Sequence, residues 1–522
     1  MFGFLDLSVA PNIPSVNRRS IYLSQGDADP PSTGGKPSVF SKKQTKKVYL
    51  CNRPSDAADA LPVTLIEPIF GQFVDDYQKI APTDTDNSFV LELSREMSSF
   101  HGDENRRMHK FRRMLSSYGI TLHAASVGST KCTSDGHLMV GKFVAAIVEG
   151  KNEIGSGIAE PFLEAIMYYR KFIEILHNPQ DDIAHLRSVV PCFHIIVFGA
   201  CIGFVGSVFT GKIQSDVLVP IIPLFWHSTD LPMQATAARA FCALKIAIRR
   251  LERLYSEPIS FLGPGEPIPE FPYPQKYFDS EEKLQEFTYD QNQELRDRLI
   301  FFGNTVGGAK ICIKFVRQYS ADAHRFCTRN GHAPELIAFE QLHGGWYMVV
   351  MDALDIHDDP ASRRTGSYRR FRKYRPLVSD IQPLEQAVTG FIHELHAEGY
   401  VHGDLRDANL FVRDIGEEAT STDFVLLDFD WAGQAGQVHY PMHVNRREIH
   451  RPDDARDGKE ILKEHDFQMV NFLFHPFLRH TDTKAVSRGL SLMSIEETSE
   501  EGGNGGSMTS EGSSNYGDAV EP

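Results

Sequence analysis

A stretch dense in proline and glycine constrains the fold of this chain more than any other sequence feature. Residues 256–275 (SEPISFLGPGEPIPEFPYPQ) contain six prolines and two glycines. Proline disrupts helix interiors and central strands, so one continuous element cannot run through this stretch. With 522 residues the chain is long enough for several domains. We therefore predict two folded domains, 61–255 and 281–480, joined by a Pro/Gly-rich linker at 256–280.

Composition suggests that both ends of the chain lie outside these domains. Residues 1–60 are rich in Pro, Ser and Lys without sustained periodicity, which predicts a disordered arm. Ser, Gly and Glu dominate 481–522, which predicts a disordered acidic tail. The formal net charge of −15 excludes a generally basic protein that coats nucleic acid. Any nucleic-acid contact must therefore come from a local patch.

The cysteines and one apolar run indicate the cellular compartment of the protein. Seven cysteines form no CxxC pair, which favours a reduced, intracellular protein, cytoplasmic or nuclear. The N-terminus lacks the pattern of a signal peptide. Residues 191–209 (PCFHIIVFGACIGFVGSVF) are long enough for a membrane helix, but their glycines and β-branched residues favour two buried strands joined by a tight turn. We expect the strands, and no membrane association.

The most specific motif is HGDLRDAN at 402–409, followed nineteen residues beyond Asn409 by Asp428. It falls between a predicted helix (LEQAVTGFIHELHAEG) and the hydrophobic strand FVLLDFD. A carboxylate, an amide five residues later and a second carboxylate after a strand suit phosphoryl transfer. Asp404 would accept the proton of an incoming hydroxyl, and Arg406 would neutralise the transferring phosphate. Asn409 and Asp428 would be hard oxygen ligands for Mg²⁺ on a nucleotide such as ATP.

An upstream strand supplies the cation that such a site needs. Lys314 lies in AKICIKFV, which follows the hairpin signal Gly307-Gly308. Flanking apolar residues would hold its amine over phosphates inside a cleft. Asp322, in the predicted helix YSADAHRF, is the best candidate for an acidic partner of Lys314.

These residues resemble the protein-kinase superfamily: HxDxxxxN, a DFG-like triad and a strand lysine. The wording HGDLR…N and LLDFDWAG is most similar to the fungal-type protein kinases common in basidiomycetes, over roughly 300–475. The resemblance implies a bilobal kinase-like fold that uses ATP and Mg²⁺ to phosphorylate a protein hydroxyl, on serine or threonine. The chain departs from the pattern in lacking a GxGxxG loop and in carrying Asp430 in place of the triad glycine. A pseudokinase scaffold, acting through protein contacts, is the alternative.

A second acidic motif lies in the first domain. Asp135 is followed by the strand KFVAAIVEG and by Glu149-Gly150-Lys151, which places three functional side chains at one sheet edge. Two carboxylates can hold a divalent cation, and a lysine can stabilise a phosphorane. The pattern resembles the PD-(D/E)xK nuclease superfamily, with Glu164 where many members carry glutamine and Glu104 as a further acid. The alternative is a surface Glu149–Lys151 ion pair.

One segment could bind polyanions. Residues 363–375 (RRTGSYRRFRKYR) contain seven basic residues interleaved with aromatic ones and no acid. This composition suits nucleic acid or an acidic substrate, and a solvated loop is the alternative. Altogether the sequence predicts an α+β protein: a kinase-like phosphotransferase preceded by an α/β nuclease-like domain. A metal-dependent nuclease with a kinase-like regulatory half is the other enzyme it allows. Its oligomeric state is not predicted.

Overall fold

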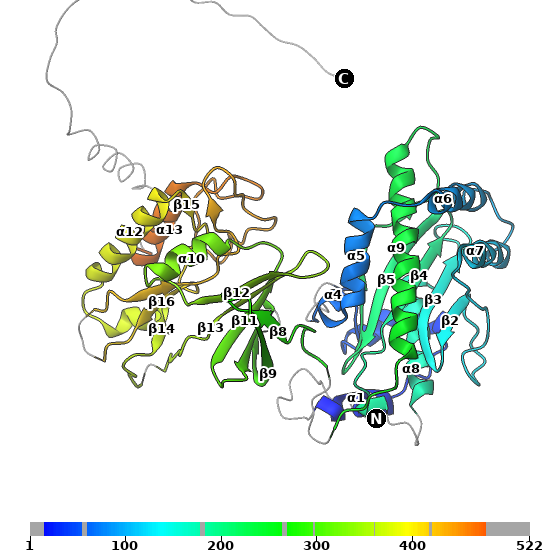
Figure 1. Ribbon diagram of the computed structural model, residues 1–522, viewed down its shortest axis with the longest axis horizontal. Helices are drawn as coiled ribbons and strands as arrows, with labels where there is room; N and C mark the ends of the chain where they lie inside the picture. The colour runs from blue at the N-terminus through cyan, green and yellow to red at the C-terminus, as the bar shows by residue number, and fades with distance from the viewer. Residues whose placement is uncertain are drawn as a thin grey trace, which may run out of the picture.

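The computed structural model describes residues 15–54, 60–177, 183–263, 269–295, 298–359, 361–416 and 420–476. They form two modules that lie side by side, divided at the Pro/Gly-rich stretch (Figure 1). The predicted acidic tail, 481–522, lies outside the described residues.

The first module is built on a mixed sheet with strand order β1-β6-β5-β4-β3-β2, and β7 pairs with β5. β3 pairs in parallel with β4, and β4 pairs antiparallel with β5. The strands are β1 (Tyr49–Leu50), β2 (Gly136–Val140), β3 (Phe143–Lys151), β4 (Cys192–Phe198), β5 (Cys201–Phe209), β6 (Ile213–Val217) and β7 (Ile222–Pro223).

Helices cover both faces of this sheet. Because side chains alternate along a strand, Phe193 packs against Phe70 and Phe73 of α5 on one face. The next residue, His194, faces Tyr169 of α8 on the other face. The helices after the first strand are α4 (Val63–Ile66), α5 (Pro68–Lys79), α6 (Asp84–Met97), α7 (Glu104–Tyr118), α8 (Pro161–Leu176) and α9 (Leu231–Ser256).

The prediction of a disordered arm over 1–60 is wrong for residues 15–54. They form α1 (Ser15–Ser24), α2 (Pro31–Gly34), α3 (Pro37–Gln44) and β1, which pairs in parallel with β6. Fully buried Arg19 donates to the backbone carbonyl groups of residues 186, 188, 209 and 210. These elements are short and are held by contacts distant in sequence, which periodicity cannot reveal. Residues 1–14 and 55–59 lie outside the described part.

The apolar run at 191–209 is the central strand pair of this sheet. β4 and β5 are joined at Gly199, whose φ of +60° suits the tight turn. Its buried residues include Phe193, Ile195 and Phe204. Among the described helices, none has the length and apolar character needed to cross a bilayer.

The second module begins at Lys276, slightly before the predicted boundary of 281. Its first lobe is an antiparallel six-stranded sheet with order β12-β13-β11-β10-β9-β8. The elements of this lobe are β8 (Lys276–Phe278), β9 (Leu284–Leu295), β10 (Ile300–Thr305), β11 (Lys310–Val316), α10 (Ala321–Arg329), β12 (Leu336–Gln341) and β13 (Tyr347–Asp352). As predicted, Gly307-Gly308 joins two hairpin strands, β10 and β11.

The second lobe of this module is mainly helical, which completes a mixed α+β arrangement of two lobes. Its elements are β14 (Tyr368–Arg370), α11 (Phe371–Tyr374), α12 (Gln382–Ala397), β15 (Tyr400–Val401), β16 (Leu410–Arg413), β17 (Phe424–Leu426), β18 (Gly433–Gln434) and α13 (Lys463–Phe474). Its core holds Leu384, Ile392 and Leu410. The loops on either side of β16 and β17 carry the HGDLRDAN motif and Asp428.

The two modules touch where the turn between β12 and β13 meets α4 and α5. The indole N–H of Trp346 donates to Thr64 Oγ1 at 3.0 Å in a buried contact. Asp75 accepts from the Gly344 amide at 3.0 Å and lies 2.9 Å from His343 Nδ1. Buried residues of both modules therefore form one continuous hydrophobic cluster. The Pro/Gly-rich stretch divides the elements without separating the cores.

Candidate functional site

Three side chains hold Asp404, which lies in the loop between β15 and β16. Its Oδ2 accepts from Arg406 Nε and Asn409 Nδ2, both at 2.9 Å. Its Oδ1 accepts from Arg451 Nη2 at 2.6 Å. The side chain is 5% exposed. Charge-assisted bonds of this kind are short and strong, so the carboxylate is fixed in orientation.

Asp466, on α13, holds the same loop in place through hydrogen bonds. Its carboxylate accepts from the backbone amides of His402 and Gly403, both at 2.8 Å, and lies 2.9 Å from His396 Nε2. Asp466 is fully buried. The ring of His402 packs at a tilt against Phe429, and its Nε2 lies 3.2 Å from the carbonyl oxygen of Leu427. Both contacts give His402 a structural role.

Lys314 on β11 lies between two aspartates of the DFD triad. Its Nζ is 2.5 Å from Asp428 Oδ1 and 2.5 Å from Asp430 Oδ1. Asp428 has φ +72°, a conformation that turns the chain sharply as it leaves β17. Two carboxylates that share one ammonium leave an excess negative charge, and this is the electrostatic setting in which proteins hold a divalent cation.

Burial and mutual attraction shift the ionisation of these three groups. Burial alone would lower the pKa of Lys314, but the attraction of Asp428 and Asp430 outweighs it and raises that pKa. Burial also opposes ionisation of Asp428, yet Lys314 holds the pKa of this carboxyl below its usual range. Burial raises the pKa of Asp430 to about 7, and the charge on Asp428 adds to the effect against the pull of Lys314. Lys314 therefore favours the ionised form of Asp428, whereas burial and the Asp428 charge oppose ionisation of Asp430.

The structure does not bring Asp322 to Lys314. Asp322 lies on the exposed side of α10, 75% exposed, and pairs with Arg325 at 3.4 Å. The buried side of α10 carries His324 instead, which stacks on Phe429 with ring centroids 4.6 Å apart. Asp430 takes the place of the expected acidic partner. The sequence signal for this contact was an acidic residue at the third position of the triad, where the kinase pattern has glycine.

The basic segment 363–375 is largely neutralised within the second lobe. Arg369 is fully buried and pairs with buried Asp414 at 2.7 Å. Four other arginines of the segment pair with aspartates: Arg363 with Asp414, Arg364 with Asp355, Arg370 with Asp358 and Arg372 with Asp407. The segment is therefore mostly a structural set of ion pairs, and its field for polyanions is weaker than its composition suggests.

The acidic residues of the first module also come together. The Asp135 Oδ2 accepts from the Gly150 amide at 2.8 Å, and the Asp135 amide donates to Glu149 Oε1 at 3.3 Å. Lys151 Nζ lies 3.0 Å from Glu164 Oε2 and 3.5 Å from Glu104 Oε1. The five ionisable residues of this cluster come from β3, the segment before β2, and the helices α7 and α8: Glu104, Asp135, Glu149, Lys151 and Glu164.

Burial dominates the electrostatics of this second cluster. Glu149 is 2% exposed, and burial, then the charges of Asp135 and Glu164, raises its pKa well above the usual range. Burial raises the pKa of Asp135 as well. A bound cation would favour the ionised form of these carboxyls. Within the described residues, however, no group of three or more His, Cys, Asp or Glu side chains is placed to hold a metal ion. Gly150 faces α7, where a Cβ would lie 2.2 Å from Met108 Sδ, so a larger residue here would require the Met108 side chain to move.

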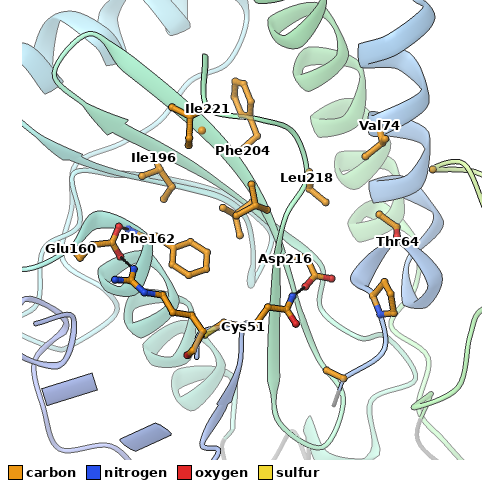
Figure 2. Close-up of a pocket in the computed structure, with 18 of the residues that line it drawn as sticks. Cys51, Thr64, Val74, Glu160, Phe162, Ile196, Phe204, Asp216, Leu218 and Ile221 are labelled. Carbon is orange, nitrogen blue, oxygen red and sulfur yellow. Dashed lines mark hydrogen bonds and ion pairs between the residues drawn. The ribbon is translucent and has the colours of Figure 1, made fainter. Parts of the chain in front are cut away.

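A cavity of about 890 Å³ opens where the first module meets the turn that carries Trp346. Figure 2 shows Phe162, Ile196 and Ile221 on its apolar walls. Its polar groups satisfy one another. Asp216 accepts from the amides of Asn52 and Val63, both at 2.7 Å, and Arg53 pairs with Glu160. This leaves little in the walls to orient a reacting group.

Comparisons with known proteins give structural matches only. No protein-family model matches the chain, and no curated protein matches it. Among solved structures, vaccinia related kinase 3 matches with 14% identity and a TM-score of 0.26, over 42% of this chain and 73% of that one. The Cydia pomonella granulovirus kinase PK-1 matches with 14% identity and a TM-score of 0.26, over 38% and 78%. Both are kinases by name, and neither identifies an activity or substrate of this chain.

Proposed function

We propose that residues 276–476 form a kinase-like phosphotransferase that moves the γ-phosphoryl group of ATP to a hydroxyl of a protein substrate. The observation that carries this proposal is the contact of Lys314 with Asp428, which Asn409 links to the catalytic loop. The side chain of Asn409 donates to Asp404, and its carbonyl oxygen accepts from Leu427, next to Asp428. Serine or threonine is the acceptor that the motif resemblance implies.

Each residue then has a task that follows from its contacts. Lys314 holds the acidic pair and would bind nucleotide phosphates. The oxygen ligands of Asp428 and Asn409 suit Mg²⁺, which when bound neutralises charge on the phosphates. Asp404, oriented by Arg406 and Asn409, would take the proton of the acceptor hydroxyl.

Isothermal titration calorimetry and radiolabelled transfer with the full chain test these assignments separately. Asp404→Ala should leave ATP·Mg²⁺ binding nearly intact and reduce transfer by about 10²-fold or more, since it contacts the acceptor. Asp428→Asn should weaken Mg²⁺-dependent binding more than Asp404→Ala does, because the Asp428 carboxylate would hold the metal before transfer begins. Asp322→Asn is a matched control, because its carboxylate is exposed on α10. Full transfer by Asp404→Ala would contradict the role of this residue.

One observation favours the pseudokinase alternative. Lys314 is already held by both aspartates of the triad, so nucleotide and metal must compete for all three side chains. A wild-type chain that takes up no ATP·Mg²⁺ at millimolar nucleotide would be a scaffold that works through protein contacts.

The clustering of Asp135, Glu149 and Lys151 favours a second candidate function, metal-dependent nucleic-acid cleavage by the first module. The two carboxylates would hold Mg²⁺ or Mn²⁺, and Lys151 would stabilise charge on the phosphate. Incubation of the full chain with plasmid and Mn²⁺ tests it, with Glu149→Gln as the matched variant because the amide keeps the shape. Equal nicking by both proteins, or none, would leave this module as an interaction domain.

A further inference from the structure

Arg451 contacts Asp404, although 47 residues separate the two in the sequence. It belongs to the segment between β18 and α13, and only 2% of its side chain is exposed. Its Nη2 donates to Asp404 Oδ1 at 2.6 Å, and its Nε donates to the carbonyl oxygen of Asn445 at 3.2 Å. Its guanidinium lies over the ring of Trp431, 4.6 Å from the centroid. These contacts fix the plane and the direction of the fork.

One arm of this fork has nothing to bind. Arg451 Nη1 is buried and has no hydrogen-bond partner within the described part of the chain. A buried donor without a partner is unfavourable, and more so when it is charged. Arg451 and Arg406 both contact Asp404, so two guanidinium groups face one carboxylate. The excess positive charge and the unpaired N–H donor would both be stabilised by a bound anion.

We propose that Arg451 binds the transferring phosphoryl group through Nη1 while Nη2 orients Asp404, an inference that rests on the phosphotransferase proposed above. The acceptor oxygen bonds to the γ-phosphorus as its proton passes to Asp404. The bond from that phosphorus to the bridging oxygen breaks, and ADP leaves with the electron pair. Negative charge stays on the γ-phosphoryl oxygens, one of which accepts from Nη1.

A lysine at this position could not make both contacts. The planar guanidinium presents several N–H donors in fixed directions, so one side chain can bridge a carboxylate and a phosphoryl oxygen at the same time. An ammonium at the same place is a point charge on a flexible stem. Arg406, the cation expected from sequence, is more exposed, at 24%, and its Nε is already used on Asp404.

The test needs no knowledge of the acceptor, because aluminium fluoride with ADP·Mg²⁺ imitates the phosphoryl group in transfer. Binding of ADP·Mg²⁺ is measured by titration with and without aluminium fluoride. Wild type should bind more tightly with fluoride present. Arg451→Gln should keep its affinity for ADP·Mg²⁺ and lose about 10²-fold of the fluoride-dependent gain, the usual effect of removing one donor to developing charge. Arg413→Gln, which alters an exposed ion pair, is the control and should keep the gain.

A second variant separates binding from folding. Arg451→Lys retains a cation for Asp404, so the loop should stay folded, and it should still lose most of the fluoride-dependent gain. Retention of the full gain in both Arg451 variants overturns the inference, as does a wild type that binds ADP·Mg²⁺ without any gain. A wild type that does not bind ADP·Mg²⁺ overturns the phosphotransferase proposal itself, and the role of Arg451 falls with it.

Discussion

Replacement of Asp466 by alanine is expected to destabilise the helical lobe and release the loop that carries Asp404. The carboxylate accepts from two backbone amides, those of His402 and Gly403, and contacts the His396 ring, all at 2.8–2.9 Å. All four residues are buried or lie in buried segments. Each donor left without an acceptor costs about 1–3 kcal/mol. Because water can enter the new space and serve some of them, we expect a total loss of about 3–5 kcal/mol, the usual effect of breaking a buried ionic contact.

Urea unfolding of the full chain, followed by tryptophan fluorescence, measures this loss. Asp466→Asn should lose less than Asp466→Ala, because one oxygen remains to accept from an amide. The exposed Asp322→Ala is the control and should change the free energy of unfolding by less than about 0.5 kcal/mol. A loss below about 1 kcal/mol for Asp466→Ala would refute the anchoring role, since a donor set of this size cannot be left unsatisfied so cheaply.

Three further changes test other parts of the structure. Burial lowers the pKa of His194 to about 3. Between pH 7 and pH 5 the unfolded chain takes up a proton at this histidine and the folded chain does not, so the free energy of unfolding should fall by about 2 kcal/mol. His194→Phe should abolish this part of the pH dependence in denaturant titrations. Asp414→Asn leaves Arg369 buried without its charge partner and should cost about 3–5 kcal/mol by the same measurement. In α5, Gly71→Ala would place a Cβ 2.8 Å from His343 and should lower the melting temperature, whereas Gly390→Ala in α12 meets open space and should raise it slightly.

Local motifs predicted the parts of the site that lie close together in sequence. Asp404, Arg406 and Asn409 fall within six residues, and one loop brings them into contact. The strand pair at 191–209 was likewise predictable, because its apolar residues and glycines are local signals. Strand alternation placed Glu149 and Lys151 on one face, and the β2–β3 hairpin, another local arrangement, brings Asp135 to Glu149.

Contacts between distant segments were not predictable in the same way. Asp322 was the natural partner for Lys314 by position in a helix, but the face that α10 turns inward is set by packing against Phe429. Arg451 reaches Asp404 from 47 residues away, and Asp466 reaches the amide of the neighbouring His402 from 64 residues away. No short motif marks either one. Residues 15–54 were missed because their short elements gain stability from the sheet edge that they complete.

The charges in direct contact divide the candidate site into two halves of opposite sign. Lys314 with Asp428 and Asp430 carries one net negative charge when both carboxyls are ionised, whereas Asp404 with Arg406 and Arg451 carries one net positive charge. Asn409 joins the halves, since its side chain donates to Asp404 and its carbonyl oxygen accepts from Leu427, next to Asp428. A metal–phosphate pair has the complementary arrangement, a cation next to an anion. A protein that only needed stable ion pairs would gain nothing from leaving each half unbalanced, because separated buried charge is costly. The imbalance is understandable if the two halves bind the two parts of one nucleotide complex.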